Sequence, residues 1–178
     1  MNYTSLYGIT AEGKGVVLRK YDNVWLFCPV LTEVLAVKYT FVQSPDLPWF
    51  IPESLETVEK RIIANKNWAD KICWALRSEA VMYTAYAKET AKILRAFHKD
   101  NASWGEKVKK GKIKDFETFN PRVVSRFHQI ADDLCCLDTE KYPYYVIKAS
   151  SLNSSVEDWF DDEGFTDITK KKHQSSYF

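Results

Sequence analysis

One uninterrupted stretch, from Glu53 to Trp104, constrains the fold of this chain more than any other feature. It holds 52 residues without a glycine or a proline, although the chain has six of each elsewhere. These two residue types commonly end helices, so their absence leaves room for one long helix. Apolar residues also recur there at helical steps of three and four: Trp68, Ile72, Leu76, Ala80, Tyr83, Ala87, Ala91 and Leu94. We therefore predict a long central helix over residues 68–99, roughly 48 Å long at ~1.5 Å per residue.

The segment before this stretch has the composition of a β-meander, which we place at residues 15–42. Its predicted strands are 16–21, 24–28 and 35–41, and Asp22-Asn23 supplies two turn residues between the first and the second. The third strand shows the clearest alternation. Its predicted inner face consists of Leu35, Val37, Tyr39 and Phe41.

Further boundaries follow from capping residues. Pro52 suits the first turn of a helix, and Asn67 is a good N-cap for the next helix. Asn120 followed by Pro121 predicts the start of a later helix, and residues 144–147 predict a fourth strand. We expect the buried face of the later helix to consist of Val123, Val124, Phe127, Ile130, Ala131 and Leu134. The glycines in residues 100–119 predict that no stable helix forms there.

Together these elements predict an α+β fold, in which a small antiparallel β-meander packs on a long central helix with two or three shorter helices. With 178 residues the chain is long enough to bury a real core. We expect one domain over residues 1–168, strand-rich in 1–50 and mainly helical in 52–168. Residues 169–178 are predicted to form a disordered tail.

Composition excludes several classes of protein. The net charge of +1 gives no overall field toward nucleic acid or membrane, and no apolar run reaches the length of a membrane span. The N-terminus has no signal-peptide pattern. The four cysteines show neither a disulfide framework nor zinc-ligand spacing, so we interpret them as small buried hydrophobes. We expect a soluble cytoplasmic (intracellular) protein with no cofactor and no metal site.

Basic charge is concentrated in one stretch, although the chain as a whole is nearly neutral. Residues 105–128 hold seven basic and three acidic side chains. The candidate partner-binding residues in this region are Trp104, Lys107, Lys109, Lys110, Lys112 and Lys114. Lysines beside an aromatic ring are typical of a loop that binds phosphate groups and stacks on bases. The alternative is a solvated surface loop paired with acidic residues of the same chain.

Acidic charge is concentrated near the C-terminus. Residues 150–168 hold six acidic side chains and no basic ones. The candidate partner-binding residues here are Asp158, Trp159, Phe160, Asp161 and Asp162. A short segment that mixes carboxylates with large rings is suited to a basic groove on another protein. The alternative is an ordinary capped helix on the surface.

One pair of residues offers a catalytic alternative. Arg122 and His128 are separated by five residues at the start of a predicted helix. This spacing resembles the arginine-to-histidine pattern of the HEPN ribonucleases, which are helical proteins that cut RNA with those two side chains. The resemblance implies RNA cleavage, usually across a dimer. It covers seven residues, and Val123 stands where that family commonly has a polar residue, so we do not assign the chain to the family.

The sequence therefore favours a non-enzymatic interaction protein, an adaptor or inhibitor that binds a protein or a nucleoprotein complex. Neither a nucleophile elbow nor a glycine-rich phosphate loop is present, which argues against an enzyme without deciding the matter. The alternative function is nucleic-acid binding through the Lys107–Lys114 loop, with RNA cleavage as its enzymatic variant. The oligomeric state, monomer or dimer, stays open.

Overall fold

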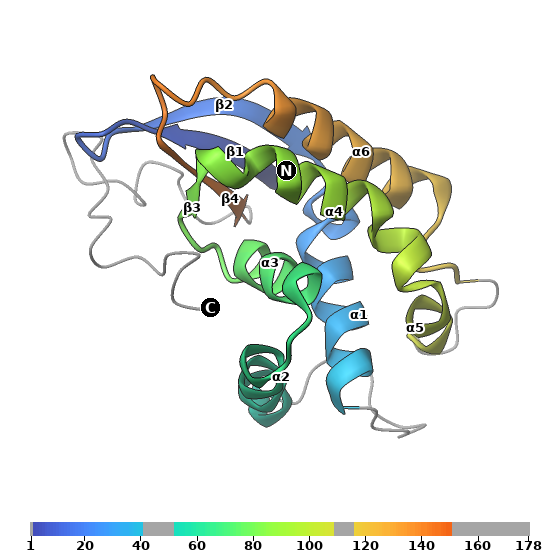
Figure 1. Ribbon diagram of the computed structural model, residues 1–178. Coiled ribbons are helices and arrows are strands. Elements are labelled where there is room, and N and C mark those ends of the chain that lie inside the picture. Colours follow the sequence, from blue (N-terminus) through green and yellow to red (C-terminus); the bar gives the residue numbers. More distant parts are fainter. Residues whose placement is uncertain (1, 41–51, 109–115, 151–178) are drawn as a thin grey trace.

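The computed structural model has an α+β fold and describes residues 2–40, 52–108 and 116–150. Its four-stranded antiparallel sheet has the order β2-β1-β4-β3 (Figure 1). The strands are β1 (Tyr3–Ile9), β2 (Gly15–Asp22), β3 (Met82–Tyr83) and β4 (Tyr144–Ser150). Strand β2 therefore forms one edge of the sheet, and β1 and β4 form its centre.

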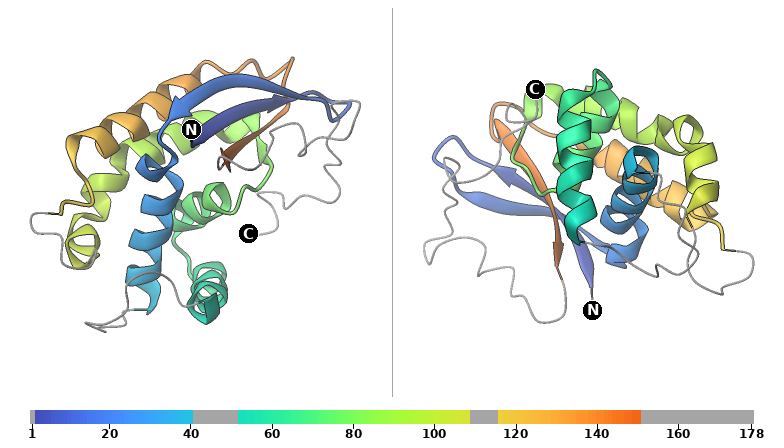
Figure 2. Two further views of the ribbon diagram at one scale, coloured as in Figure 1. Left: turned by 180° about the vertical axis from the view of Figure 1, so that it is seen from behind. Right: turned by 90° about the horizontal axis from the view of Figure 1, so that it is seen from below.

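The helices pack together on one face of this sheet, as the two views of Figure 2 show. They are α1 (Cys28–Thr40), α2 (Pro52–Ala64), α3 (Trp68–Arg77), α4 (Ala87–Asp100), α5 (Ala102–Lys107) and α6 (Pro121–Cys135). Two short 3₁₀ helices, η1 (Val24–Leu26) and η2 (Thr84–Tyr86), connect strands to helices. The core between sheet and helices contains fully buried large side chains such as Trp74, Phe27 and Phe127. Within the described residues, no helix is both long and apolar enough to cross a membrane.

Two of the predicted strands are wrong. Residues 24–26 form η1, and residues 28–40 form α1. Asn23, directly after β2, has a left-handed φ of 61°, and its side chain accepts a hydrogen bond from the N–H of Trp25. The turn residue therefore starts a helical segment and not a hairpin. The predicted first strand corresponds to β2, but its partner is β1, which is not among the predicted strands.

The predicted long helix is also wrong, because the chain breaks after α3. Ser78 and Glu79 end α3 with a Schellman arrangement, in which the N–H of Glu79 bonds to Leu76 and that of Ala80 bonds to Ala75. Glu79 adopts a left-handed φ of 54°, a conformation that usually requires glycine. The following residues pair with β4 as β3 before α4 begins. The apolar stripe is therefore shared between two helices.

Other boundaries are confirmed. Helix α2 begins at Pro52, Asn67 caps α3, and Asn120 caps α6 through the N–H groups of Arg122 and Val123. Strand β4 contains the predicted 144–147. The expectation of no helix in residues 100–119 is wrong for α5, in which Gly105 lets the ring of Phe119 pack directly on the backbone. The predicted tail, 169–178, lies outside the described residues.

Candidate functional site

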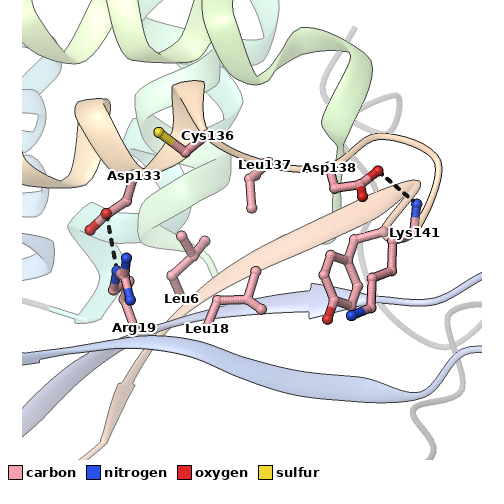
Figure 3. A pocket seen from close by; sticks show the side chains of 9 residues that line it. Leu6, Leu18, Arg19, Asp133, Cys136, Leu137, Asp138 and Lys141 are labelled. Carbon is pink, nitrogen blue, oxygen red and sulfur yellow. Dashed lines mark hydrogen bonds and ion pairs between the residues drawn. The ribbon is translucent and has the colours of Figure 1, made fainter.

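Two pockets lie where α6 meets the edge strand β2, one toward each end of α6, and we call the pair the β2–α6 groove. The first, about 310 Å³, is lined by Leu6, Leu18, Arg19, Asp133, Cys136, Leu137, Asp138, Lys141 and Tyr142 (Figure 3). The second, about 400 Å³, is lined by Asp22, Asn23, Leu26, Pro121, Arg122, Ser125, Arg126 and Gln129. Strand β2 contributes residues to both pockets, and the segment directly after it contributes residues to the second.

The first pocket has an apolar floor and a polar rim. Leu6 and Leu18 come from the sheet, and Leu137 comes from the segment that leaves α6 (Figure 3). Asp138 holds this segment in a turn, because its carboxylate accepts the backbone N–H groups of residues 140 and 141 at 3.0 Å. The pocket therefore offers apolar contact area with charged groups at its margin.

Asp133 fixes α6 against β2 between the two pockets. Its carboxylate accepts a hydrogen bond from Arg19 Nε at 3.2 Å and one from the hydroxyl of Tyr21 at 2.7 Å. Burial, reinforced by the hydrogen bond to Asp133, raises the pKa of Tyr21, so this hydroxyl stays a donor at ordinary pH. These contacts connect the helix to the edge strand and hold the groove in one shape.

The second pocket carries two arginines on one face of α6. Arg126 donates to the backbone carbonyl of Asp22, its guanidinium lies 5.4 Å from the ring centre of Tyr21, and its Nε donates to Gln129 at 3.1 Å. Burial lowers the pKa of Arg126, although an arginine stays charged at any ordinary pH. Arg122 precedes it by one helical turn and is exposed. The second pocket is also lined by Asp22, so its two arginines face one carboxylate and leave this end of the groove with a net positive charge.

The outer edge of β2 borders the same groove. The N–H of Asn23 bonds to the carbonyl of Asn2, which identifies these two as a hydrogen-bonded pair of the antiparallel ladder. Such pairs alternate, so residues 21 and 19 also bond to β1, while Asp22 and Lys20 direct their backbone groups away from it. The contact from Arg126 to the carbonyl of Asp22 agrees with this direction. Lys20 therefore presents its N–H and C=O along the outer edge of the sheet.

A β-bulge and charged side chains protect the edge of β2 from non-specific pairing with other strands. The register of β1 with β2 shifts between Leu6 and Tyr7, which leaves Leu18 as a bulged residue. A bulge and exposed charges such as Arg19 and Lys20 are common devices against non-specific pairing of sheet edges. The open part of the edge is consequently short and lies directly beside the groove.

The structure places some of the predicted site residues and leaves others undescribed. Trp104 and Lys107 lie on α5, where the ammonium of Lys107 is 4.4 Å from the ring centre of Trp104. The remaining residues of the predicted basic and acidic sites lie outside the described residues: Lys109, Lys110, Lys112, Lys114, Asp158, Trp159, Phe160, Asp161 and Asp162.

Arg122 and His128 lie on different sides of α6. His128 follows Arg122 by six positions, with five residues between them, so the two side chains lie about 120° apart around a helix of 3.6 residues per turn. Arg122 lines the groove, whereas the ring of His128 lies 6.0 Å from that of His98 on α4. In the structure the neighbour of Arg122 in the pocket is therefore Arg126 and not His128. Sequence reasoning missed Arg126, although its spacing of four residues from Arg122 is a visible signal of a shared face.

Two further observations concern other kinds of site. Within the described residues, no group of three or more histidine, cysteine or acidic side chains is arranged to hold a metal ion. A pocket of about 230 Å³ near α1, α3 and α4 is lined by Lys38 and Asp70, whose ion pair of 2.8 Å links α1 to α3. That carboxylate also accepts the hydroxyl of Tyr39 at 2.5 Å, so its hydrogen bonds serve the packing of the helices.

Comparison with known proteins adds no identity. The chain matches no protein-family model, no curated protein and no solved structure. The β2–α6 groove is consequently interpreted from its own chemistry. It combines an open strand edge, an apolar pocket and two arginines, which suits binding of an extended chain better than it suits a reaction.

Proposed function

We propose that this chain is a non-enzymatic interaction protein, an adaptor or inhibitor, which holds an extended segment of a partner protein along the β2–α6 groove. The observation that carries the proposal is the position of the groove beside the outward backbone groups of Lys20 on an edge strand. An extended peptide added to a sheet edge gains main-chain hydrogen bonds, and adjacent pockets select its side chains.

The charges of the groove favour an acidic partner segment. Arg122 and Arg126 line the second pocket against the one carboxylate of Asp22, and in the first pocket Arg19 already pairs with Asp133. A carboxylate on the bound segment would meet these guanidinium groups, whose planar geometry suits carboxylates. An apolar side chain placed elsewhere along the segment would enter the first pocket, on the floor formed by Leu6 and Leu18.

A matched pair of substitutions at Lys20 tests the strand-addition step. Lys20→Pro removes one outward N–H, and proline is tolerated on an edge strand when its nitrogen faces away from the ladder. Lys20→Ala removes the same side chain but keeps the N–H. Random peptides displayed on phage are selected against the full chain, and the selected peptides are then titrated into both variants.

We expect the selected peptides to be acidic and to lose about tenfold in affinity in the proline variant, because one hydrogen bond is worth ~1 kcal/mol and its neighbours are disturbed. The alanine variant should bind nearly as the unchanged protein does. Arg122→Glu should weaken binding and reduce its dependence on salt. Equal affinity of the two Lys20 variants would refute strand addition.

The nucleic-acid alternative is tested on the same protein with labelled single-stranded RNA and duplex DNA at two salt concentrations. Salt-sensitive binding that disappears on replacing Lys109, Lys110 and Lys112 by glutamate would transfer the function to the basic loop. Shortened RNA that is absent with His128→Ala would favour the ribonuclease variant. A protein-binding role predicts that intact nucleic acid stays unbound.

A further inference from the structure

Another pocket lies where α1 begins and α3 ends, apart from the β2–α6 groove. It has a volume of about 440 Å³ and is formed by η1, the first turns of α1, the end of α3 and single residues of α2 and β4. Its described lining residues are all different from those of the groove. Small-molecule sites have volumes of roughly 300–1,000 Å³. The pocket is therefore large enough for a ligand much smaller than a partner protein.

The guanidinium of Arg77 lines this pocket and is held in a fixed position. Its Nε donates to the hydroxyl of Thr32 on α1 at 3.0 Å, and its plane lies 4.9 Å from the ring centre of Trp74. These contacts use Nε and one face of the guanidinium, whereas its terminal nitrogens carry the remaining N–H groups. Such a pair of nitrogens matches the two oxygens of a carboxylate. The first turn of α1 also lines the pocket, and the positive end of its dipole favours the same negative charge.

The carboxylate of Glu79 lines the same pocket. Its Oε1 accepts the backbone N–H of Ala149 at 3.0 Å, which fixes the side chain beside β4. A carboxylate accepts several hydrogen bonds, so this contact is compatible with further bonds from an ammonium group. The hydroxyl of Ser78, which also lines the pocket, has no hydrogen-bond partner within the described residues. Glu79 and Ser78 therefore offer oxygen atoms to a ligand with N–H donors.

The two opposite charges act on the same side chain of the pocket. Burial raises the pKa of the Cys28 thiol, the carboxylate of Glu79 raises it further, and the guanidinium of Arg77 lowers it. Because both charges reach one thiol, a single small molecule can contact both. A ligand with one charge would be attracted by one of these groups and repelled by the other. The pocket consequently favours a ligand that carries a negative and a positive charge together.

Apolar side chains form the rest of the lining. Trp25 on η1 is 53% exposed, the highest value among the large apolar side chains that the structure describes. Pro29 and Leu55 line the pocket with it. An accessible tryptophan ring offers a large flat contact area for a ring or a branched aliphatic group. The ligand that fits the whole lining therefore has an apolar part beside its two charges.

We propose that this pocket binds a free amino acid with a large apolar side chain. The α-carboxylate of the ligand accepts hydrogen bonds from Arg77, and its α-ammonium donates to Glu79 and Ser78. The side chain of the ligand packs against Trp25 and Leu55. This small-molecule site goes beyond the binding of a partner protein and does not depend on the β2–α6 groove.

Titration calorimetry of the full chain with L-phenylalanine, L-tryptophan and L-leucine tests the proposal. Two analogues of each amino acid keep the side chain: the N-acetyl form lacks the ammonium group, and the amide lacks the carboxylate. We expect a free amino acid to bind and each of its analogues to bind about tenfold more weakly or worse, because hydrogen bonds between charged groups are lost. This comparison uses the unchanged protein, so it does not depend on the folding of a variant. Absence of binding by all three amino acids, or equal affinity for either analogue, would overturn the proposal.

Substitutions then locate the bound amino acid. Arg77→Gln and Glu79→Gln each remove one charge, and glutamine at position 79 keeps an oxygen that can accept the N–H of Ala149. Each should weaken binding about tenfold. Arg61→Gln is the matched control, since it removes an exposed arginine of α2 outside the described lining and should leave the affinity unchanged. Unchanged affinity in Arg77→Gln or in Glu79→Gln, or an equal loss in Arg61→Gln, would place the amino acid elsewhere and contradict the assignment.

Discussion

Replacing Asp70 by alanine tests how strongly one partly buried ion pair stabilises the helical layer. The Asp70 side chain is 3% exposed and lies 2.8 Å from the ammonium of Lys38, whose side chain is 20% exposed. It also accepts the hydroxyl of Tyr39 at 2.5 Å, and burial raises the pKa of that hydroxyl so that it stays a donor. Removing the carboxylate therefore leaves two donors of α1 without their acceptor on α3.

The expected loss can be set from these contacts. Removing one partner of a buried pair costs about 3–5 kcal/mol because it leaves a buried charge uncompensated. Lys38 keeps some solvent access and donates to Asn101 Oδ1 at 3.3 Å, which places the loss near the lower end, about 3 kcal/mol. For a chain of this size such a loss lowers the melting temperature by ~6–12 °C. Urea titration followed by circular dichroism measures the free energy of unfolding directly.

Asp100→Ala is the matched control, because it removes an exposed carboxylate from the same pocket. It should change the free energy of unfolding by less than ~0.5 kcal/mol. The double variant Lys38→Met/Asp70→Leu should be more stable than Asp70→Ala, since it leaves no unpaired charge. If Asp70→Ala is no less stable than Asp100→Ala, the ion pair contributes nothing and this reasoning is refuted.

Two other predictions concern the core. Burial raises the pKa of the Cys28 thiol from its ordinary value of 9.0 to about 12, so the unfolded thiol ionises first as the pH rises. The stability that Cys28 contributes through this pKa difference is therefore fully present below pH 9 and is lost between pH 9 and 12. In urea titrations, the free energy of unfolding should consequently decrease less steeply with pH over that range in Cys28→Ala than in the unchanged protein. Gly105→Ala should destabilise the fold by about 1 kcal/mol in thermal melts despite better helix propensity, because a Cβ would lie 2.5 Å from the Phe119 ring. A stabilised alanine variant would show that the ring moves freely.

Local signals in the sequence were sufficient for several parts of the fold. Asn67 and Asn120 cap helices with their own side chains, and Pro52 needs no partner to start a helix. These interactions lie within one turn of the chain, so their residue types can be recognised without tertiary information. Strand β4 is likewise rich in β-branched and aromatic residues.

Helix α1 could not be recognised in the same way, for a physical reason. Its buried residues are Cys28, Val30, Leu31, Thr32, Val34 and Leu35, and the rest of the helix is half-buried, so that none of its residues is exposed. A helix without an exposed face has no amphipathic period, and its β-branched residues are typical of a strand. Burial between the sheet and the other helices decides the outcome, and no window of sequence contains that information.

The candidate groove could not be predicted from the sequence either, because the residues that form its two sides are far apart in the chain. Arg19 and Tyr21 meet Asp133 across more than 100 residues. Sequence reasoning selected Arg122 for its distance from His128, whereas in the structure Arg122 lies with Arg126 beside β2. Charge density along the sequence identified stretches rich in one sign, but pairing such as that of Arg19 with Asp133 decides which charges remain available to a partner.

Glu79 explains why one apolar stripe serves two helices. A glycine at this left-handed position would have marked the end of α3, but the chain has a residue that favours helix. Its carboxylate accepts the backbone N–H of Ala149 at 3.0 Å, so the end of the helix is fixed by a strand 70 residues away. Residues 82–83 then join β4, and α4 begins in a new direction. The hydrogen bond between Glu79 and Ala149 thus also attaches the helical layer to the sheet. Because this contact is tertiary, helical periodicity in the sequence predicted one continuous helix.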